Sequence, residues 1–411
     1  MNPSRTPSVR FKGYEDEWEE RKLGEFSDVR DGTHASPKYV SQGHPMVTSK
    51  NLTHSGLDMT DVSFLTDEDF NEINKRSKVS IGDILFGMIG TIGNPVIVDR
   101  DDFAIKNVAL IKEKTSNPIT NKWLLQYLKS PSFNRFIQKE NAGGTQKFIA
   151  LGLIRDMKLR VPEFDEQQKI GAFFKKIDET IALHQRKLNL LNEQKKGFLQ
   201  KMFPKNGEKI PEIRFAGFND DWEERKLGEL AKSFEYGLNA SAKEFDGYHK
   251  YIRITDIDDC THEFIQNKLT SPDVDFTNAD NYILQRGDIL FARTGASVGK
   301  SYYYKENDGL VYFAGFLIRA RIKPEVSPKF VFQNTLTSKY NEFITITSQR
   351  SGQPGVNAEE YSNFKMMVPS FEEQEKIGTF FKQLDDTIAL HQRKIDELKS
   401  MKKSMLQKMF V

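Results

Sequence analysis

Apolar residues recur at alternating spacings of four and three along two stretches of the chain. The first stretch runs from Ile170 to Met202 and the second from Ile377 to Met409. Such a sustained heptad pattern predicts one long helix in each stretch, with helix-on-helix packing along the seam. The seam positions are Ile170, Phe174, Ile177, Ile181, His184, Leu188, Leu191, Lys195, Phe198 and Met202, then Ile377, Phe381, Leu384, Ile388, His391, Ile395, Leu398, Lys402, Met405 and Met409.

Four seam positions are polar. His184 and His391 occupy equivalent places. An imidazole in a seam is usually a hydrogen-bonded residue that fixes the register, so we expect neither a metal site nor a catalytic group there. Lys195 and Lys402 can extend their ammonium groups to the solvent while their methylenes pack in the seam.

The two helices belong to a tandem repeat. The segment PSVRFKGYEDEWEERKLGEF, from Pro7, recurs as PEIRFAGFNDDWEERKLGEL from Pro211. Near the other end, VPEFDEQQKIGAFFKKIDETIALHQRK from Val161 recurs as VPSFEEQEKIGTFFKQLDDTIALHQRK from Val368. A period of about 200 residues is too long for a solenoid, so each copy should be a globular domain with an appended helix.

The pattern between the repeated ends predicts α+β domains. Short β-like runs (HPMVTS, ILFGMIG and NPVIVD; YIRITDI, DILFAR and YFAGFLIRARI) alternate with turns, and two segments, NKWLLQYLKSPSFNRFIQ and PKFVFQNTLTSKYNEFIT, have helical patterns. Trp18 and Trp222 should be buried in a short docking strand or turn that leads into a helix. The expected boundaries are 1–25 (N-terminal segment), 26–160 (domain 1), 161–204 (helix 1), 205–229 (linker and repeated N-terminal segment), 230–367 (domain 2) and 368–411 (helix 2).

The linker suggests how the helices pair. Pro204, Gly207 and Pro211 end the first helix, so a whole domain lies between the two helices in the sequence. Two like units joined in tandem favour a pseudo-twofold arrangement, which makes the paired helices antiparallel. The seam from Ile170 to Met202 would be roughly 48 Å long.

Composition narrows the class of protein. The formal net charge of the 411 residues is +2, so any surface for a polyanion must be local. The single cysteine, Cys260, fits a reducing compartment and excludes a Cys-rich zinc site. The polar start MNPSRTPSVR and the lack of a long apolar run predict a cytoplasmic protein without a membrane span.

The stretch RTGASVGKS, from Arg293, raises the possibility of a nucleotide-binding loop. In a Walker loop a Gly is followed by four residues and then by Gly-Lys-Ser or Gly-Lys-Thr, but here Thr294 holds the place of the first Gly, and Gly295 comes one residue too late. The related segment GDILFGMIGTIGN, from Gly82, has Asn94 instead of the lysine. We therefore expect the Gly-rich turn to shape a recognition loop.

These features together resemble the specificity subunits of type I restriction-modification systems, over almost the whole chain from Trp18. The resemblance rests on the doubled V-P-x-F-x-E-Q-x-K-I-G segment at Val161 and Val368, on the doubled GDIL segment with its Gly-rich turn, and on Gly144-Thr145-Gln146 with its counterpart Gly352-Gln353. It implies two target-recognition domains that each read half of a split duplex-DNA site, with helices that space them. It also implies two methyltransferase subunits and endonuclease/translocase subunits as partners, and these would carry S-adenosylmethionine, ATP and Mg.

Base reading needs donors and acceptors such as Arg, Lys, Asn and Gln on shaped loops. The candidate DNA contacts are Lys38, Tyr39, Ser49, Lys50, Asn51, Thr53, His54, Thr91, Asn94, Gln146 and Lys147 in domain 1, and Tyr236, Asn239, Ser241, Lys243, Arg253, Arg293, Thr294, Ser297, Lys300 and Arg350 in domain 2. Glu166-Gln167 and Glu373-Gln374 should be structural, capping or docking pairs.

No catalytic, cofactor or metal motif is recognisable, so we expect a non-catalytic chain without its own cofactor. Two other interpretations stay open at this point. One is an antiparallel coiled-coil scaffold that binds only proteins, and the other is a small NTPase built on the Gly-rich turn. Preference for one split DNA sequence would distinguish the first from a specificity subunit, and ATP turnover lost in Lys300→Ala would favour the second.

Overall fold

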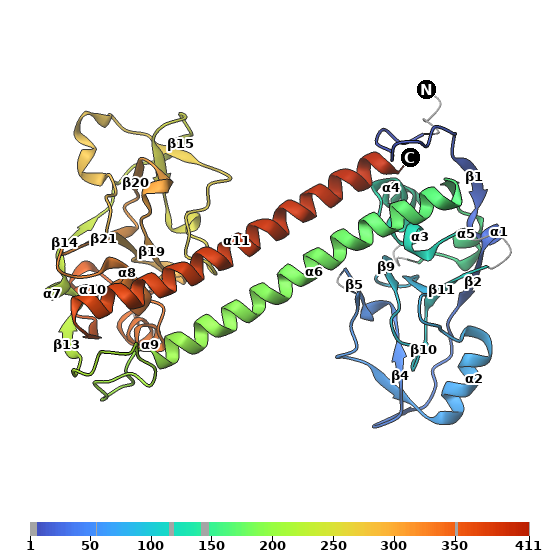
Figure 1. Ribbon diagram of the computed structural model, residues 1–411, viewed down its shortest axis with the longest axis horizontal. Helices are drawn as coiled ribbons and strands as arrows, with labels where there is room; N and C mark the ends of the chain where they lie inside the picture. Colours follow the sequence, from blue (N-terminus) through green and yellow to red (C-terminus); the bar gives the residue numbers. More distant parts are fainter. Residues whose placement is uncertain (1–5, 55, 115–118, 141–147, 350–351, 411) are drawn as a thin grey trace. The chain divides into compact units, whose positions relative to one another are not determined.

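A computed structural model describes residues 6–54, 56–114, 119–140, 148–349 and 352–410. The chain forms two compact units (Figure 1). Unit 1 contains Met1–His184 and Lys394–Val411, and unit 2 contains Gln185–Arg393. Each unit therefore includes parts of both long helices.

A four-stranded antiparallel sheet forms the centre of unit 1, with the strand order β2-β11-β8-β9. Its strands are β2 (Ser27–Asp31), β11 (Val108–Glu113), β8 (Ile84–Gly87) and β9 (Gly93–Ile97). A second sheet has the order β10-β4-β7-β3, from β10 (Ala104–Ile105), β4 (His44–Val47), β7 (Ser63–Leu65) and β3 (Tyr39–Val40). The remaining small elements are the hairpin β5 (Leu52–Thr53) and β6 (Gly56–Leu57), the 3₁₀ turn η1 (Ser49–Asn51) and helix α2 (Asp67–Ser77).

Three shorter helices and a two-stranded pairing complete unit 1. The helices are α3 (Asn121–Leu128), α4 (Pro131–Glu140) and α5 (Leu151–Asp156). Strand β1 (Glu19–Lys22) leads into α1 (Leu23–Phe26) and pairs with β12 (Lys158–Val161), which immediately precedes the long helix α6 (Phe164–Lys201). The start of the repeat is thereby tied to the entry of its own helix.

Unit 2 repeats the central sheet, the docking strands and, apart from α2, the helices of unit 1, whereas its smaller strands are arranged differently. Its central sheet is β14-β21-β18-β19, from β14 (Ala231–Tyr236), β21 (Leu317–Ile322), β18 (Asp288–Ala292) and β19 (Ser301–Tyr303). Strand β13 (Glu223–Lys226) leads into α7 (Leu227–Leu230) and pairs with β22 (Lys365–Val368), before the long helix α11 (Phe371–Met409). The other elements are β15 (Ala242–Glu244), β16 (Lys250–Ile252), β17 (Thr270–Pro272), β20 (Val311–Phe313), α8 (Pro328–Asn334), α9 (Ser338–Thr347), α10 (Ala358–Ser362) and the 3₁₀ turns η2 (Ile254–Asp256), η3 (Phe276–Asn278), η4 (Asp280–Tyr282), η5 (Gly295–Ser297) and η6 (Glu306–Asp308).

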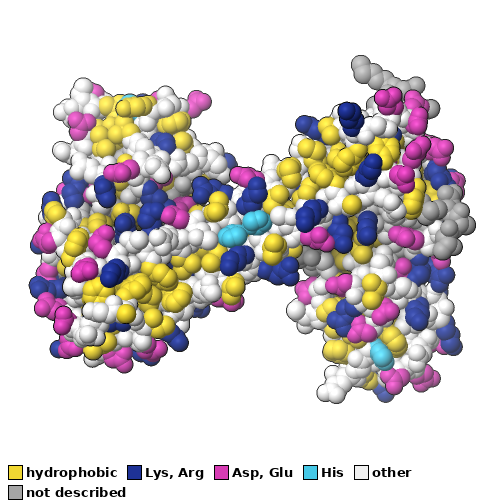
Figure 2. Space-filling model, in the orientation of Figure 1, with side chains coloured by type: hydrophobic (Ala, Val, Ile, Leu, Met, Phe, Trp, Pro, Cys, Tyr) yellow, Lys and Arg dark blue, Asp and Glu magenta, His cyan; other side chains and the backbone are white. Residues whose placement is uncertain are grey.

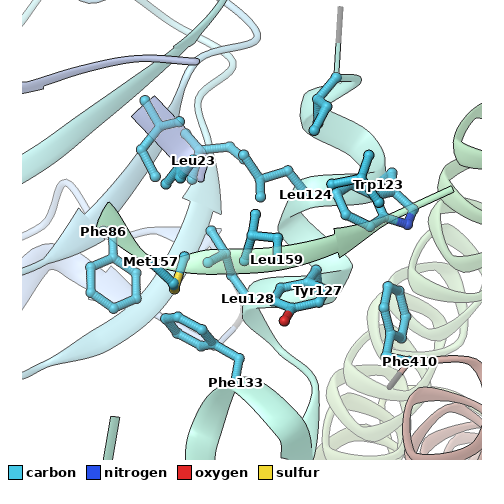
Figure 3. Packing of buried hydrophobic residues seen from close by; sticks show 14 of the residues in the cluster. Leu23, Phe86, Trp123, Leu124, Tyr127, Leu128, Phe133, Met157, Leu159 and Phe410 are labelled. Carbon is cyan, nitrogen blue, oxygen red and sulfur yellow. The ribbon is translucent and has the colours of Figure 1, made fainter. Parts of the chain in front are cut away.

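The cores follow from apolar runs in the central strands. Strands β8 and β18 are buried at every position, which explains why both GDIL segments read as continuous apolar runs. In unit 1 the cluster continues through Trp123, Tyr127 and Phe133 from the shorter helices, and Phe410 after α11 joins it (Figure 3). On the surface, Lys and Arg side chains are interspersed with Asp and Glu over both units, as the balanced charge predicts (Figure 2).

The long helices run antiparallel within each unit. In unit 1, Phe174 and Asp178 of α6 contact Phe410 and Lys402 respectively, so the α6 numbers rise as the partner numbers fall. In unit 2, Lys195 contacts Asp385, and Phe198 contacts Phe380. This pairing agrees with the antiparallel arrangement that the sequence predicts.

The α+β prediction is confirmed, as are the main elements. NKWLLQYLKSPSFNRFIQ forms α3 and α4, and PKFVFQNTLTSKYNEFIT forms α8 and α9. The expected docking strands form, and the buried Trp18 and Trp222 lie directly before them. Every seam position from Ile170 to Met202 and from Ile377 to Met409 is buried or half-buried. The proposed domain boundaries stay predictions.

Candidate nucleic-acid interface

One edge of the central sheet in unit 2 gathers three loops. Strands β14 and β18 end, and β21 begins, at this edge, because Tyr236 pairs with Ile318 and Ala292 with Leu317. The loops are residues 237–241, 293–300 and 314–316, and we call them the loop edge of unit 2. Six of the sequence-predicted DNA contacts of domain 2 lie in these loops, namely Asn239, Ser241, Arg293, Thr294, Ser297 and Lys300, and Tyr236 lies directly before the first loop.

Unit 1 has an equivalent loop edge, formed by residues 32–38, 88–92 and 106–107. Glycines at matching places bring two loops together. A Cβ atom on Gly32 would lie 2.3 Å from the Ile105 carbonyl oxygen, and one on Gly237 would lie 2.1 Å from that of Ala314. The same glycine amides donate to Val108 at 3.0 Å and Leu317 at 3.1 Å. The two loop edges therefore share a backbone that tolerates no side chain at this point.

Arginine and aromatic residues occupy the loop edge of unit 2. The guanidinium of Arg293 lies 4.9 Å from the ring centroid of Tyr236, a cation–π contact, and its Nη1 donates to the Gly315 carbonyl at 3.4 Å. Phe316, in the adjoining loop, is 65% exposed. These contacts hold an arginine fork and an aromatic ring next to one another at the surface, where both can reach a ligand.

The loop edge of unit 1 differs in chemistry. Met88 stands where unit 2 has Arg293, and it is buried. The polar group here is His34, whose Nε2 lies 2.9 Å from Asp31 Oδ2 and whose Nδ1 lies 2.9 Å from Asn107 Oδ1. The hydrogen bond to Asp31, and then that to Asn107, raises the pKa of His34. His34 and Asn107 were not predicted as site residues, although His34 lies in the loop that follows β2 and Asn107 directly precedes β11.

The Gly-rich turn of unit 2 is not an open phosphate cradle. It joins β18 to β19 in a hairpin, whereas a Walker loop leads into a helix. Its amides already have acceptors: Gly295 donates to Pro354 at 2.9 Å, Gly299 to Ala292 at 3.0 Å, and Lys300 to Ser297 at 3.0 Å. The structure therefore gives no support to the NTPase interpretation.

Lys300 is engaged within the protein. Its Nζ donates to the Ile257 carbonyl at 3.0 Å and forms an ion pair with Asp259. Its side chain is only 11% exposed. A contact between Lys300 and DNA would compete with both partners, and it stays a prediction.

Several other predicted contacts also bond within their own domain. Ser49 and Asn51 are buried. Asn51 Oδ1 accepts from the Thr48 backbone amide at 2.9 Å, and Asn51 Nδ2 donates to the Asp58 and Asp61 carbonyls. Asn94 donates to the Leu52 carbonyl at 3.0 Å, and Arg253 forms a two-point ion pair with Asp256. The side chains of Asn51, Asn94 and Arg253 therefore stabilise the fold of their own domains.

The remaining predicted residues divide by exposure. Lys38, Tyr39, His54, Thr91, Asn239 and Ser241 are exposed, as are Lys50, which pairs with Asp61, and Lys243, which pairs with Asp273. Thr53, Thr294 and Ser297 are half-buried. Gln146, Lys147 and Arg350 lie outside the described residues.

A buried carboxylate supports the frame of each unit. Glu166 is 0% exposed, and it accepts from Arg10 Nε at 2.7 Å and Nη2 at 2.8 Å. Glu373 accepts from Arg214 at the same two distances. Trp18 Nε1 also donates to Glu166, at 3.2 Å. The repeated Glu therefore ties the start of each copy to the entry of its own helix, and Arg10 and Arg214 were missed as its partners.

The rest of the repeated motif fixes the helix entry. Gln167 donates to the Pro162 carbonyl at 3.0 Å and accepts from the Thr120 amide at 3.1 Å, and Gln374 does the same with Pro369 and Ser327 at 2.9 and 3.1 Å. A Cβ atom on Gly171 would lie 2.9 Å from Lys122, and one on Gly378 would lie 2.7 Å from Lys329. The motif thus encodes the close packing of α6 on α3 and of α11 on α8.

The seam lysines form ion pairs. Lys402 Nζ lies 2.5 Å from Asp178, and Lys195 Nζ lies 2.6 Å from Asp385. The two lysines are equivalent in the repeat, and so are the two aspartates. Since each pair joins the two long helices within one unit, it favours the antiparallel register in that unit.

The end of each long helix carries a Met-Phe pair that packs on aromatic residues. Phe203, after α6, contacts Trp222, Phe330 and Phe381 in unit 2. Phe410, after α11, contacts Trp18, Trp123 and Phe174 in unit 1. Figure 3 shows Phe410 near Trp123 and Tyr127. Neither phenylalanine belongs to the predicted seam.

The described residues contain no cluster of three or more His, Cys, Asp or Glu that could hold a metal ion. None of their helices is long and apolar enough to cross a membrane.

Two copies of one α+β unit, each with a loop edge on a shared backbone, define a duplicated recognition protein. The family described as "Type I restriction modification DNA specificity domain" matches residues 15–193 and 219–400, and the chain belongs to this family. It is thus a specificity subunit with two target-recognition domains, and not one of the catalytic subunits. Such a subunit assembles with the other subunits of its system and binds DNA.

Individual proteins are similar to this chain in sequence or in fold. A putative type I restriction enzyme MjaX specificity subunit of Methanocaldococcus jannaschii is 24% identical over 412 residues, covering 95% of this chain and 92% of that protein. The crystal structure of the type I system S subunit from M. genitalium has a TM-score of 0.70 at 15% identity, over 99% of both chains. A further structure, from work on complex assembly and conformational transition of the type I system, has a TM-score of 0.50 at 15% identity, over 96% of this chain and 98% of the other.

Proposed function

We propose that each target-recognition domain reads one half of a split duplex-DNA site, and that the two long helices set the spacing between the halves. The observation that carries this proposal is the pair of loop edges. Both are built on the same glycine-dependent backbone, yet Arg293 in one corresponds to buried Met88 in the other. A shared backbone with different side chains is what two readers of different sequences require.

Arg293 is the strongest candidate for a base contact. Its cation–π contact with Tyr236 orders the guanidinium, so less conformational entropy is lost when it binds. An arginine fork matches the O6 and N7 acceptors of guanine in the major groove. Replacing it should relax specificity at one base pair of one half-site.

The helices also carry a surface for the partner subunits. Leu183 and Leu390 are equivalent in the repeat and are 60% and 59% exposed. Phe164 and Phe371, also equivalent, are 40% and 48% exposed at the two helix starts. Apolar residues exposed at matching places support docking of two like methyltransferase subunits, one for each repeat.

In this proposal the catalysis belongs to the partners. Two methyltransferase subunits bind S-adenosylmethionine, and endonuclease/translocase subunits use ATP and Mg. The specificity chain supplies the target sequence and the distance between its halves.

A binding selection tests the proposal. The chain, assembled with its methyltransferase subunit, is incubated with randomised duplexes, and the bound DNA is sequenced. We expect a motif in two parts whose centres lie about 34 Å apart, one helical turn, because both readers face the same side of the duplex. A contiguous motif would contradict the two-reader proposal, and the absence of any motif would favour a scaffold that binds only proteins.

A further inference from the structure

Each unit has a cavity at the same place in the repeat. In unit 1 a cavity of about 450 Å³ lies between α11, the turn that joins β8 to β9, and the start of α4. In unit 2 a cavity of about 520 Å³ lies between α6, the Gly-rich turn that joins β18 to β19, and the start of α9. The wall that each long helix supplies is repeated too, since Lys402 and Lys403 in unit 1 correspond to Lys195 and Lys196 in unit 2.

The cavity of unit 1 is strongly basic. Lys129, Lys399, Lys402 and Lys403 line it, and there is no Asp or Glu among its described lining residues. Lys402 is neutralised by Asp178 from outside the wall. Burial, and then the charge of Lys402, lowers the pKa of Lys129. Three lysines therefore face this space with no carboxylate in its lining.

The cavity of unit 2 is also basic, but fewer lysines line it. Its lining contains Lys195, Lys196 and Lys300 and one acidic residue, Asp259. Asp259 pairs with Lys300, and Lys195 pairs with Asp385. This leaves Lys196 as the uncompensated charge of the wall.

Lys196 and Lys403 form a matched pair. Both are exposed, both occupy the same position in the repeated helix, and each lines its cavity. Neither forms a hydrogen bond or an ion pair within the part of the chain that the structure describes. A lysine in a concave wall without a counter-ion is suited to an anion from outside the protein.

We propose that these two cavities bind phosphates of the DNA backbone beside the two half-sites. This inference rests on the proposed function. Each cavity is lined by a hairpin of the central sheet. In unit 1 these residues are Ile92 of the β8–β9 turn and 93–95 at the start of β9, and in unit 2 they are 296–300 of the β18–β19 turn, so each cavity adjoins the loop edge of its domain. Duplex phosphates lie next to the base edges that such loops would read. The long helices then hold DNA as well as spacing the readers.

The test compares two pairs of lysines in the assembled complex. Lys196→Gln with Lys403→Gln removes one uncompensated charge from each cavity. Lys187→Gln with Lys394→Gln is the control, because these exposed lysines are equally repeated in the helices and line neither cavity. Affinity is measured between about 50 and 200 mM salt for a duplex with the selected motif and for one without it.

The cavity variant should bind both duplexes more weakly by a similar factor, about tenfold at the lower salt, and the slope of log K against log salt should fall by about one unit for each lysine. The control should keep both the affinity and the slope. An unchanged slope in the cavity variant, with the wild type still selective, overturns the inference and leaves the proposed function intact. If the wild type binds both duplexes equally well, this result contradicts the proposed function itself.

Two further results would also overturn the inference. Loss of selectivity at one base position, with non-specific affinity unchanged, would mean that these lysines read bases. Stabilisation of the free chain by tripolyphosphate, lost in the cavity variant while DNA affinity is unchanged, would identify a site for a small anion. Sedimentation of the assembled complex checks that the variant keeps its partners, and failure to assemble would assign the lysines to subunit docking instead.

Discussion

Units 1 and 2 share the ion pairs that hold their long helices in place, which we call the frame, and they differ in the side chains of their loop edges. Glu166 and Glu373 bind their arginines at identical distances, and Asp178–Lys402 and Lys195–Asp385 are the same ion pair in the two copies. At the loop edges, in contrast, only the backbone is shared. The frame is therefore the same in both units, whereas the side chains of the loop edges differ between them.

The difference has a physical cause. A buried carboxylate or a glycine against a carbonyl has few acceptable replacements, because an unpaired buried charge or a steric overlap is costly. A loop side chain exposed to solvent can change with little effect on folding. A protein built this way can alter its target without altering its architecture.

The seam should give the largest loss of stability. Ile388 is buried and Ile181 is half-buried, so replacing both with Asp should destabilise the chain by at least about 4 kcal/mol. The control replaces the exposed Leu183 and Leu390 with Ser, which should change stability little but weaken methyltransferase docking. Guanidinium unfolding and sedimentation measure the two effects. Equal stability of the two double variants would show that Ile181 and Ile388 do not form the seam.

Removing the buried carboxylate should have the next largest effect. Glu166→Gln removes the negative charge that pairs with Arg10 and one of its two acceptor oxygens, and should cost about 3 kcal/mol, with a similar loss for Glu373→Gln. The cost should be greater for Glu166, because the one oxygen that Gln retains cannot accept from both Arg10 nitrogens and from Trp18 as the carboxylate does. Denaturant unfolding provides the measurement. Asp165→Asn and Glu372→Gln are exposed controls in the same helix turns, and a loss as large in these would contradict a special role for the buried pair.

The shared glycines allow a smaller and more local test. Gly32→Ala and Gly237→Ala each place a methyl group against a carbonyl, at 2.3 and 2.1 Å, and should cost about 2 kcal/mol. Gly197→Ala is a control with nothing within 4 Å in a helix, and it should stabilise by about 0.5–1 kcal/mol. Each loop-edge variant should also weaken DNA binding at its own half-site. Loop-edge variants as stable as the wild type would mean that the shared backbone is not constrained there.

The pKa values of two histidines should be shifted in opposite directions. Hydrogen bonding to Asp31 raises the pKa of His34, so its stabilising effect is full below the unfolded pKa of about 6.5 and disappears as the pH rises through the folded value. Burial lowers the pKa of His262, so unit 2 loses stability as the pH falls from about 6.5 through its folded value. NMR titration of the two rings, assigned with His34→Gln and His262→Gln, measures both. A higher midpoint for His262 than for His34 would contradict these environments.

Much of the frame could be predicted because it repeats. The heptad spacing identified both long helices, and the doubled ends of the repeat identified the two units. The sequence could not show that Glu166 meets Arg10, since their residues lie 156 positions apart and only folding brings them together. A search for charged residues shared by both repeats would have suggested this pair and also Asp178 with Lys402.

The loop edges were harder to predict, and for a different reason. Donor-rich composition selected Asn51 and Arg253, whose groups bond within the protein, alongside Arg293, which lies at the loop edge. His34 was missed although it lies at the same edge in unit 1. Composition reports which groups can bond, whereas strand register determines which of them share an edge.

Exchanging one domain tests the central claim, that each domain reads its own half-site, most directly. Residues 26–160 are replaced by the corresponding domain of another specificity subunit, and the methylated sites made by the assembled complex are mapped by sequencing. We expect one half of the split motif to change while the other half and the spacing are retained, and the reciprocal exchange of residues 230–367 should change only the other half. A change in both halves after a single exchange would contradict the claim that the two domains read independently.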